Sequence, residues 1–418
     1  MIPVFLYLVA LYIRPQDWVP GLINLPTAFM FIPLGLALGL SNRLREPEKF
    51  ITPQNWLMLI YLAIIFISTL VNVDFISAFD QLTMFAKRVA VFYMIIWLVI
   101  TPRRVEATIW IVMALSAFLA FQAILQATVG ESWGGLTSYP GYAMVRVRWY
   151  GDWDGPNVFG LLFVIASGLA FEYIFGPHGL ITRIVAATFA ISYVVAINYT
   201  NSRGAVLALA LMALFYFRSR FKSVFSIVLA FSLVGALLAL GPSRMNEVSS
   251  SESSAHERTW MWEQALTLLR NHPFFGVGRN EFFKNVDLGL IAHNNYVQNF
   301  TELGLIGFFC FMSLLWFSFK GNYILSDPRY AVSPQLVAFS RAMTATLVGY
   351  MATTFFVVME LDLLYFVFGL CASVYLVAAR EHPNLPRLAF TSKDVLIVGI
   401  VVFLIIAMIW LAAIKRIL

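Results

Sequence analysis

The sequence has little charge and almost no cysteine. Only 12% of its 418 residues are Asp, Glu, Lys or Arg, whereas 60% are hydrophobic, and the mean hydropathy is +0.80. This balance excludes a soluble globular domain and indicates a polytopic membrane protein. Cys310 and Cys371 both lie in apolar stretches, which excludes a disulfide framework and a thiolate metal site.

Motifs for metal, nucleotide or nucleic-acid binding are also missing. No HExxH, paired-acid or cysteine cluster occurs, and His256 and His272 do not stand at a metal-ligand spacing from His293, so we expect no metal and no cofactor. Gly276-Val277-Gly278 is too short for a dinucleotide site and reads as a turn. The net charge of +6 comes from residues at the ends of apolar stretches, without a basic run, so nucleic acid is not an expected partner.

What the chain does contain is a series of apolar stretches of about 20 residues, the length that crosses a bilayer as a helix. The fold class expected is an all-α polytopic membrane protein with about 12–13 transmembrane helices and one large polar loop containing amphipathic helices. The first stretch lacks a basic start and a cleavage site, so it is expected to be a retained span. Spans are predicted at 1–13, 22–40, 55–71, 83–100, 107–129, 157–175, 181–199, 204–217, 223–241, 303–319, 338–359, 363–380 and 395–414.

These spans divide the chain into four parts: N-terminal helices (1–130), central helices with Arg-containing loops (131–241), a large loop (242–302) and C-terminal helices (303–418). Positive residues alternate between the connections, and the positive-inside rule places the richer set in the cytoplasm. The opposite side then receives 130–156, 200–203 and 242–302. Lys415 and Arg416 would also fall on that side, against the rule.

The segment from His293 to Phe308 joins a polar start to a glycine-spaced apolar helix. If the helix begins at His293, then Val297, Phe300, Gly304 and Gly307 lie on one face. Small residues allow a neighbouring helix to approach closely. The two glycines are therefore expected to pack this helix against a neighbour and to fix His293 at the end of that helix pair. A neutral imidazole there could accept a hydroxyl proton, although a lone histidine is more often structural.

Arg203 stands where Asn201 or Ser202 can cap a helix that starts at Gly204. A guanidinium beside a helix N-terminus suits a phosphate group, while the alternative is an arginine that reaches lipid headgroups. Arg258 precedes Trp262 by one turn in an amphipathic helix that is expected to lie on the membrane surface. It is a second candidate for binding a phosphate group, and the alternative is a charge on the solvent-exposed face of this helix.

Arg146 and Arg148 alternate with valines in the connection 130–156. In an extended segment both side chains would point the same way, so they are two further candidates for binding a phosphate group. The alternative is an ordinary surface loop.

Three motifs resemble the bacterial O-antigen ligase and polymerase superfamily, which are membrane glycosyltransferases of the GT-C type. The ligase pattern of His, an Asn, Ser or Gln, nine residues, Gly, two residues and a small residue is similar to His293, Asn294, Gly304 and Gly307. Ser202-Arg203-Gly204 opening a span and Arg258-Thr259 followed by Trp262 add weaker matches. The resemblance covers roughly residues 150–380.

The resemblance implies an inverting, metal-independent transfer of a glycan from undecaprenyl pyrophosphate to an acceptor hydroxyl at the periplasmic face of the bacterial inner membrane. His293 would be the base and Arg203 and Arg258 would bind the pyrophosphate, with Arg146 and Arg148 as further candidates. Asn294, Ser202, Gly304 and Gly307 would support them. The implied partners are the lipid-linked glycan donor, lipid A core or a glycan acceptor, and membrane lipids.

Several alternatives stay open. An O-antigen ligase with lipid A core as acceptor ranks first, and a polymerase that uses another lipid-linked repeat unit ranks second. A protein O-oligosaccharyltransferase shares the same motif. A transporter of lipid-linked glycan would need ionisable residues at mid-membrane depth, where Glu172 is nearly the only carboxylate within a predicted span. A purely structural subunit would leave the shared side of the Arg and His residues unexplained.

Overall fold

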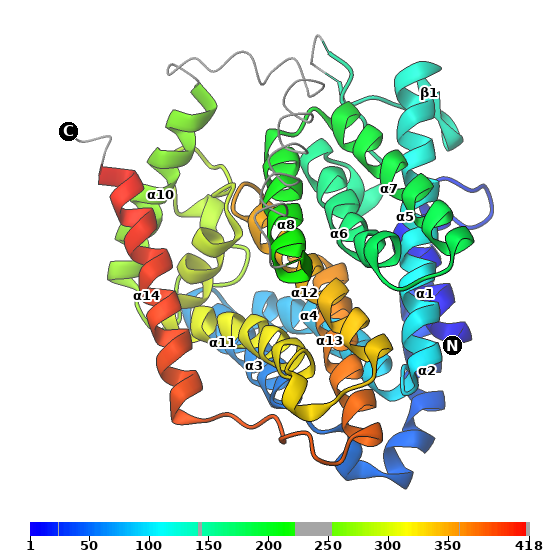
Figure 1. Cartoon of the computed structure of the whole chain (residues 1–418). Helices are drawn as coiled ribbons and strands as arrows, with labels where there is room; N and C mark the ends of the chain where they lie inside the picture. The colour runs from blue at the N-terminus through cyan, green and yellow to red at the C-terminus, as the bar shows by residue number, and fades with distance from the viewer. Residues whose placement is uncertain (24, 141–143, 222–252, 359, 415–418) are drawn as a thin grey trace.

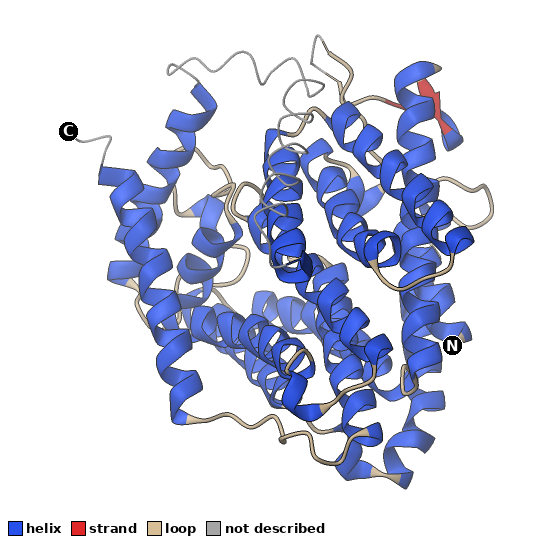
Figure 2. Ribbon diagram, viewed as in Figure 1, coloured by secondary structure: helices blue, strands red, loops and turns tan. Residues whose placement is uncertain are grey.

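The computed structural model describes residues 1–418 except 24, 141–143, 222–252, 359 and 415–418 (Figure 1). The predicted span 223–241, Lys415 and Arg416 therefore lie outside the described residues. In the described ranges nearly all regular structure is helical, and the two strands form one short hairpin (Figure 2). The predicted all-α class is confirmed.

Each predicted span within the described residues corresponds to a helix, with limits that differ by up to eight residues. Their bounds are α1 (Ile2–Tyr12), α2 (Thr27–Arg45), α3 (Pro53–Asn72), α4 (Phe75–Leu98), α5 (Pro102–Thr128), α6 (Pro156–Phe175), α7 (Leu180–Thr200), α8 (Arg203–Phe221), α10 (Ser253–Asn271), α11 (Asn295–Leu325), α12 (Pro334–Thr354), α13 (Asp362–Glu381) and α14 (Ser392–Ile414). Short 3-10 helices occupy Pro15–Asp17, Pro47–Phe50, Trp133–Gly135, Gly151–Trp153, Phe282–Lys284 and Pro328–Tyr330. Strands β1 (Glu131–Ser132) and β2 (Leu136–Thr137) pair antiparallel, Glu131 with Thr137.

Within the part of the chain that is described, nine helices are long and apolar enough to cross a membrane, which confirms a polytopic membrane protein. They are α3 to α8, α11, α13 and α14, and α1 is a shorter apolar helix. Helices α2 and α12 occupy two further predicted spans, but neither meets the same criterion of length and apolar composition.

Local sequence signals set several helix starts. Asp74 accepts a hydrogen bond from the Ser77 backbone N–H at 2.7 Å and caps α4. Thr52 and Asn55 form a reciprocal capping box at the start of α3. Proline follows the cap in α3, α5, α6 and α12, where its missing N–H costs no helical hydrogen bond.

The centre and rim of the helix bundle differ in burial. The apolar stretch of α13 is 89% buried within the protein and that of α6 is 83% buried, whereas that of α14 is only 17% buried. Helix α6 packs against α7, α12 and α8, and α14 contacts α10 and α11 along one edge (Figure 1). A helix that is apolar all round and mostly uncovered is suited to face lipid, so α14 is a peripheral span.

Helix α11 is broken near its start, which corrects the prediction of one continuous helix from His293. Gly304 has φ 66° and ψ −171°, a conformation open only to glycine. The backbone N–H groups just after the break are bonded by the loop between α10 and α11. Leu305 N–H donates to Pro273 O in this loop at 2.8 Å. The side chains before and after Gly304 therefore do not share one helical face.

The same loop also pairs with the end of the first half of α11. The backbone N–H of Val277 and that of Gly278 donate to Thr301 O and Glu302 O, each at 3.0 Å. A Cβ at Gly276 would lie 2.4 Å from the Thr301 carbonyl oxygen. Gly276-Val277-Gly278 is thus more than a turn: it satisfies the backbone groups that the helix break releases, as an irregular membrane segment requires.

Candidate active site

Two of the connections expected on the outer side contact helix ends that are remote in sequence. The 145–147 segment binds the end of α7, where Val147 N–H donates to Tyr199 O at 3.2 Å. The loop after α10 reaches α3, where Arg279 N–H donates to Thr69 Oγ1 at 3.2 Å. Each of these loops is thus held against a helix end that is remote from it in sequence.

His293 lies at the start of α11, half-buried, in a left-handed backbone conformation with φ 50°. Asn294, not His293, is the N-cap: its side-chain oxygen accepts from Tyr296 N–H at 2.9 Å and from Val297 N–H at 3.2 Å. The predicted helix start is therefore shifted by two residues, to Asn295. His293 stands just outside the helix and is held there by the cap that follows it.

Arg258 acts on His293 from helix α10. Burial lowers the pKa of His293, the positive charge of Arg258 lowers it further, and the carboxylate of Glu257 opposes both. The neutral imidazole is the form able to accept a proton. The structure thus brings the candidate base and one candidate phosphate-binding arginine together.

Trp262 does not lie at the membrane interface as predicted. It is 8% exposed, and its indole N–H donates to Ala292 O at 3.0 Å. Helix α10 packs against α11 and α14. The Trp262 face of this helix therefore packs on the segment before His293, and the prediction that this face lies against the membrane is wrong.

Arg203 opens α8, one residue earlier than predicted, and Ser202 caps this helix. The Ser202 hydroxyl oxygen accepts from Ala205 N–H at 3.3 Å. Asn201 has a different function: it ends α7 in a left-handed conformation, and its side chain donates to Val145 O at 2.7 Å. The half-buried Arg203 therefore stands at the positive end of a helix, as the phosphate-site prediction requires.

Phe355 and Phe356, directly after α12, join the starts of α8 and α11. A Cβ at Gly204 would lie 2.9 Å from Phe356 Cβ, so the start of α8 packs directly on that side chain. The Phe355 ring lies 5.7 Å from the Trp262 ring and 6.4 Å from the Tyr296 ring. The helix ends that bear Arg203 and His293 are thus neighbours of one aromatic pair.

Arg146 and Arg148 have different surroundings, although both were expected to point the same way. Arg146 is 7% exposed, and its guanidinium lies 3.4 Å from both Thr200 O and Asn157 Oδ1. Arg148 forms an ion pair with Asp154 at 2.8 Å. Arg146 therefore lies near the end of α7 that leads to Arg203, whereas Arg148 is directed to a carboxylate of its own loop.

Gly304 does not face a neighbouring helix as predicted, whereas Gly307 does lie close to a side chain of α3. A Cβ at Gly304 would lie 2.3 Å from Phe274 O, in the backbone of the loop. A Cβ at Gly307 would meet Leu303 of its own helix at 2.3 Å and Ile64 of α3 at 3.3 Å. Gly304 allows the helix break, and Gly307 allows the close turn after it.

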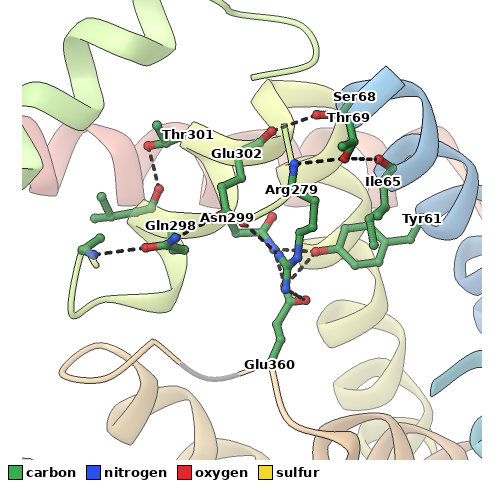
Figure 3. A network of polar contacts seen from close by, with 12 residues as sticks. Tyr61, Ile65, Ser68, Thr69, Arg279, Gln298, Asn299, Thr301, Glu302 and Glu360 are labelled. Atoms are coloured by element: carbon green, nitrogen blue, oxygen red, sulfur yellow. Dashed lines mark hydrogen bonds and ion pairs between the residues drawn. The ribbon is translucent and has the colours of Figure 1, made fainter. Parts of the chain in front are cut away.

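A buried ionic cluster lies beside this segment, and the sequence reasoning did not find it (Figure 3). Arg279, in the loop before α11, places one nitrogen 2.7 Å from Glu360 and another 3.4 Å from Glu302. Burial disfavours the charge, but Glu360 and Glu302 outweigh burial and raise the pKa of Arg279. Glu302 and Glu360 stand at the ends of predicted spans in a charge-poor chain, and Arg279 stands in the large loop, but their pairing required the tertiary structure.

Glu360 lies at the centre of this cluster. It accepts hydrogen bonds from the Tyr61 hydroxyl at 2.7 Å and the Tyr365 hydroxyl at 3.1 Å, and Asn299 also donates to it. The contacts connect α3, α11, α13 and the loop that bears Arg279. In the described ranges, no three His, Cys, Asp or Glu side chains gather where they could hold a metal ion.

The comparison with known protein families agrees with this geometry. Residues 187–312 match the family described as O-antigen ligase. This match supports the resemblance to the O-antigen ligase/polymerase superfamily. No curated protein matches the chain.

The O-antigen ligase match spans the end of α7, α8, α10 and the first part of α11, so it contains Arg203, Arg258 and His293. Arg146 and Arg148 precede it. The match supports a glycosyltransferase of the O-antigen ligase or polymerase kind, in lipopolysaccharide or polysaccharide biosynthesis, with lipid-linked glycan and lipid A as the general substrates.

Proposed function

We propose that the protein is an inverting O-antigen ligase that transfers a glycan from undecaprenyl pyrophosphate to a hydroxyl of lipid A core. The observation that carries this proposal is the meeting of three elements: the start of α8 with Arg203, helix α10 with Arg258, and the start of α11 with His293. Phe355 and Phe356 contact all three elements.

In this mechanism His293 accepts the proton of the acceptor hydroxyl while the hydroxyl oxygen attacks the anomeric carbon of the donor. The bond between that carbon and the pyrophosphate oxygen breaks from the opposite side, so the configuration inverts. Burial and Arg258 favour the neutral imidazole that this step needs.

Negative charge grows on the leaving pyrophosphate as the bond breaks. Arg203 and Arg258 are proposed to bind this group, since a guanidinium donates two parallel hydrogen bonds to phosphate oxygens. The positive end of α8 adds to the same stabilisation. Arg146 is a further candidate because of its position beside Thr200, whereas the ion pair with Asp154 makes Arg148 the weakest member of the set.

We also propose that this site faces the periplasm from the inner membrane. The connections rich in Lys and Arg are predicted to be cytoplasmic, and the connections 130–156, 200–203 and 242–302, the last of which contains His293, are predicted on the other side. Asn201 in the second of them donates to Val145 O in the first at 2.7 Å, which supports their placement on one side.

A polymerase remains the second candidate, because it would use the same base and the same pyrophosphate site with another lipid-linked repeat unit as acceptor. The His293, Asn294, Gly304 and Gly307 spacing favours a ligase. A protein O-oligosaccharyltransferase or a transporter of lipid-linked glycan ranks below both.

The test uses the purified protein in nanodiscs with undecaprenyl-pyrophosphate glycan, with and without lipid A core, and reads products by gel mobility and mass. Glycan on lipid A core supports a ligase, and longer lipid-linked glycans without added acceptor would indicate a polymerase. The variant His293→Ala should lose transfer, while His272→Ala, which changes an exposed histidine after α10, should keep it. Full activity of His293→Ala would remove the histidine from the mechanism.

A further inference from the structure

The residue before His293 is held on both sides of its backbone. Ala292 N–H donates to Gln298 Oε1 at 3.1 Å, and Ala292 O accepts from the Trp262 indole at 3.0 Å. Ala292 itself is fully buried. Because His293 follows directly in a left-handed conformation, the position of Ala292 determines the direction in which the imidazole leaves the backbone.

The orientation of the Gln298 amide is set by a carboxylate. Gln298 Nε2 donates to Glu302 Oε1, one helical turn further along α11 (Figure 3). An ionised carboxylate only accepts hydrogen bonds, so the amide must present its NH₂ group to Glu302 and its oxygen to Ala292 N–H. The charge on Glu302 therefore reinforces the orientation in which Gln298 holds Ala292.

Glu302 is 2% exposed and needs a partner to stay ionised. Arg279 supplies that partner at 3.4 Å and is itself paired with Glu360 at 2.7 Å. The contacts thus run without interruption from Glu360 through Arg279, Glu302 and Gln298 to the backbone beside His293.

We propose that this line of contacts is a positioning network for the candidate base, with Gln298 as the residue that connects it to the backbone of Ala292, directly before the histidine. The inference rests on the proposed function of His293. Gln298, Glu302 and Arg279 act here through the backbone and not on the reacting atoms. The pairs of Arg279 with Glu302 and Glu360 therefore orient the His293 imidazole, in addition to joining helices.

An exchange of the two side chains tests the proposal. Gln298→Glu places two carboxylates together, and Glu302→Gln removes the group that orients the amide. In the double variant Gln298→Glu/Glu302→Gln, the carboxylate at 298 accepts from Ala292 N–H and from the amide at 302, so the connection returns. Each single variant should lower kcat by about tenfold or more, as a misplaced catalytic group does, with little change in donor affinity. The double variant should regain most of the wild-type kcat.

Gln264 offers a matched control. Its amide also bridges a carboxylate and a backbone N–H, those of Asp287 at 2.7 and 2.9 Å, but it does not contact Ala292. Gln298→Met should lower kcat while Gln264→Met should not. Equal loss in the two Met variants, or a double variant no better than the singles, would overturn the proposal.

A second measurement is independent of glycan transfer. Diethyl pyrocarbonate modifies neutral imidazole, and peptide mapping gives the rate at His293 relative to the exposed His272. The charged groups that act on His293, Arg258 and Glu257, are unchanged in all variants. The rate should rise severalfold in Gln298→Met and return to the wild-type value in the double variant.

The two measurements separate the two claims. Reactivity that follows this pattern in a protein without transferase activity would overturn the proposed function and leave the positioning network standing. If Gln298→Met changes neither the modification rate of His293 nor kcat, the proposed positioning network is wrong.

Discussion

The indole N–H of Trp262 lies 3.0 Å from the carbonyl oxygen of Ala292 and ties helix α10 to the residue before His293. Trp262→Phe removes this hydrogen bond but keeps an aromatic ring against Phe355. We expect a severalfold lower kcat because the buried Ala292 carbonyl loses its donor. Trp410→Phe on α14, where the side chain is 52% exposed, is the control and should leave transfer unchanged. Equal kcat in the two variants would show that the hydrogen bond has no part in transfer.

The pH dependence of transfer should carry the signature of His293. Burial and Arg258 lower its pKa from 6.5, so the imidazole stays neutral, and transfer stays active, to lower pH than for an ordinary histidine. Glu257 raises this pKa, and Glu257→Gln should therefore move the acidic limb of the kcat profile to lower pH. Glu281→Gln, which removes a carboxylate paired with Lys284, should not move it. A limb that stays in place in Glu257→Gln would contradict the assignment of the limb to His293.

Gly304→Ala should destabilise the protein by at least about 2 kcal/mol, since its positive φ is strained for other residues and the new Cβ would meet Phe274 O. Gly399→Ala on α14 has no atom within 4 Å of the new Cβ and should be neutral or slightly stabilising. Thermal unfolding in detergent compares the two variants. Similar Tm values would show that the break in α11 is not required.

Arg279→Gln leaves Glu302 and Glu360 without their buried cation and should cost about 3–5 kcal/mol of stability. The double variant Arg279→Gln/Glu360→Gln should recover part of the loss because it removes one of the two stranded charges. Arg329→Gln, which breaks a pair whose arginine side chain is 79% exposed, should leave the stability almost unchanged. The same unfolding measurement gives all three values, and a mild effect of Arg279→Gln alone would mean that the carboxylates are protonated when unpaired.

Arg203→Lys keeps the positive charge but loses the planar pair of donors, so we expect most of the transfer activity to disappear. Arg220→Lys at the other end of α8, where the guanidinium donates to Phe175 O, should keep activity. The transfer rate at saturating donor gives kcat and the rate at limiting donor gives kcat/KM, so the two together separate an effect on donor binding from an effect on catalysis. A fully active Arg203→Lys would show that bidentate geometry at this position does not matter.

The candidate site was predictable where a short motif determines local structure. Ser202 before Arg203, and Asn294 after His293, are caps, and the structure places both at helix starts. The correspondence of predicted and observed helices has the same origin, because hydrocarbon length and apolar composition act on each segment separately. Their limits were wrong by up to eight residues, where caps and prolines decide.

Predictions failed where two distant segments decide the outcome. The Gly304 and Gly307 spacing is compatible with helix packing and with a helix break, and only the loop at Phe274 distinguishes the two. From the sequence, Trp262 could face lipid or protein. In the structure it faces protein, because its indole N–H donates to the Ala292 carbonyl oxygen. Arg279, Glu302 and Glu360 are separated by tens of residues, so no local pattern could reveal their pairing.

Local composition and short motifs were enough to predict the membrane class, most of the helices and the three residues proposed for catalysis. The break in α11, the support that α10 gives to the backbone before His293, and the buried ionic cluster connected to it could be seen only in the folded chain. Those features depend on hydrogen bonds and charge pairs between remote segments, which form only when the chain is folded.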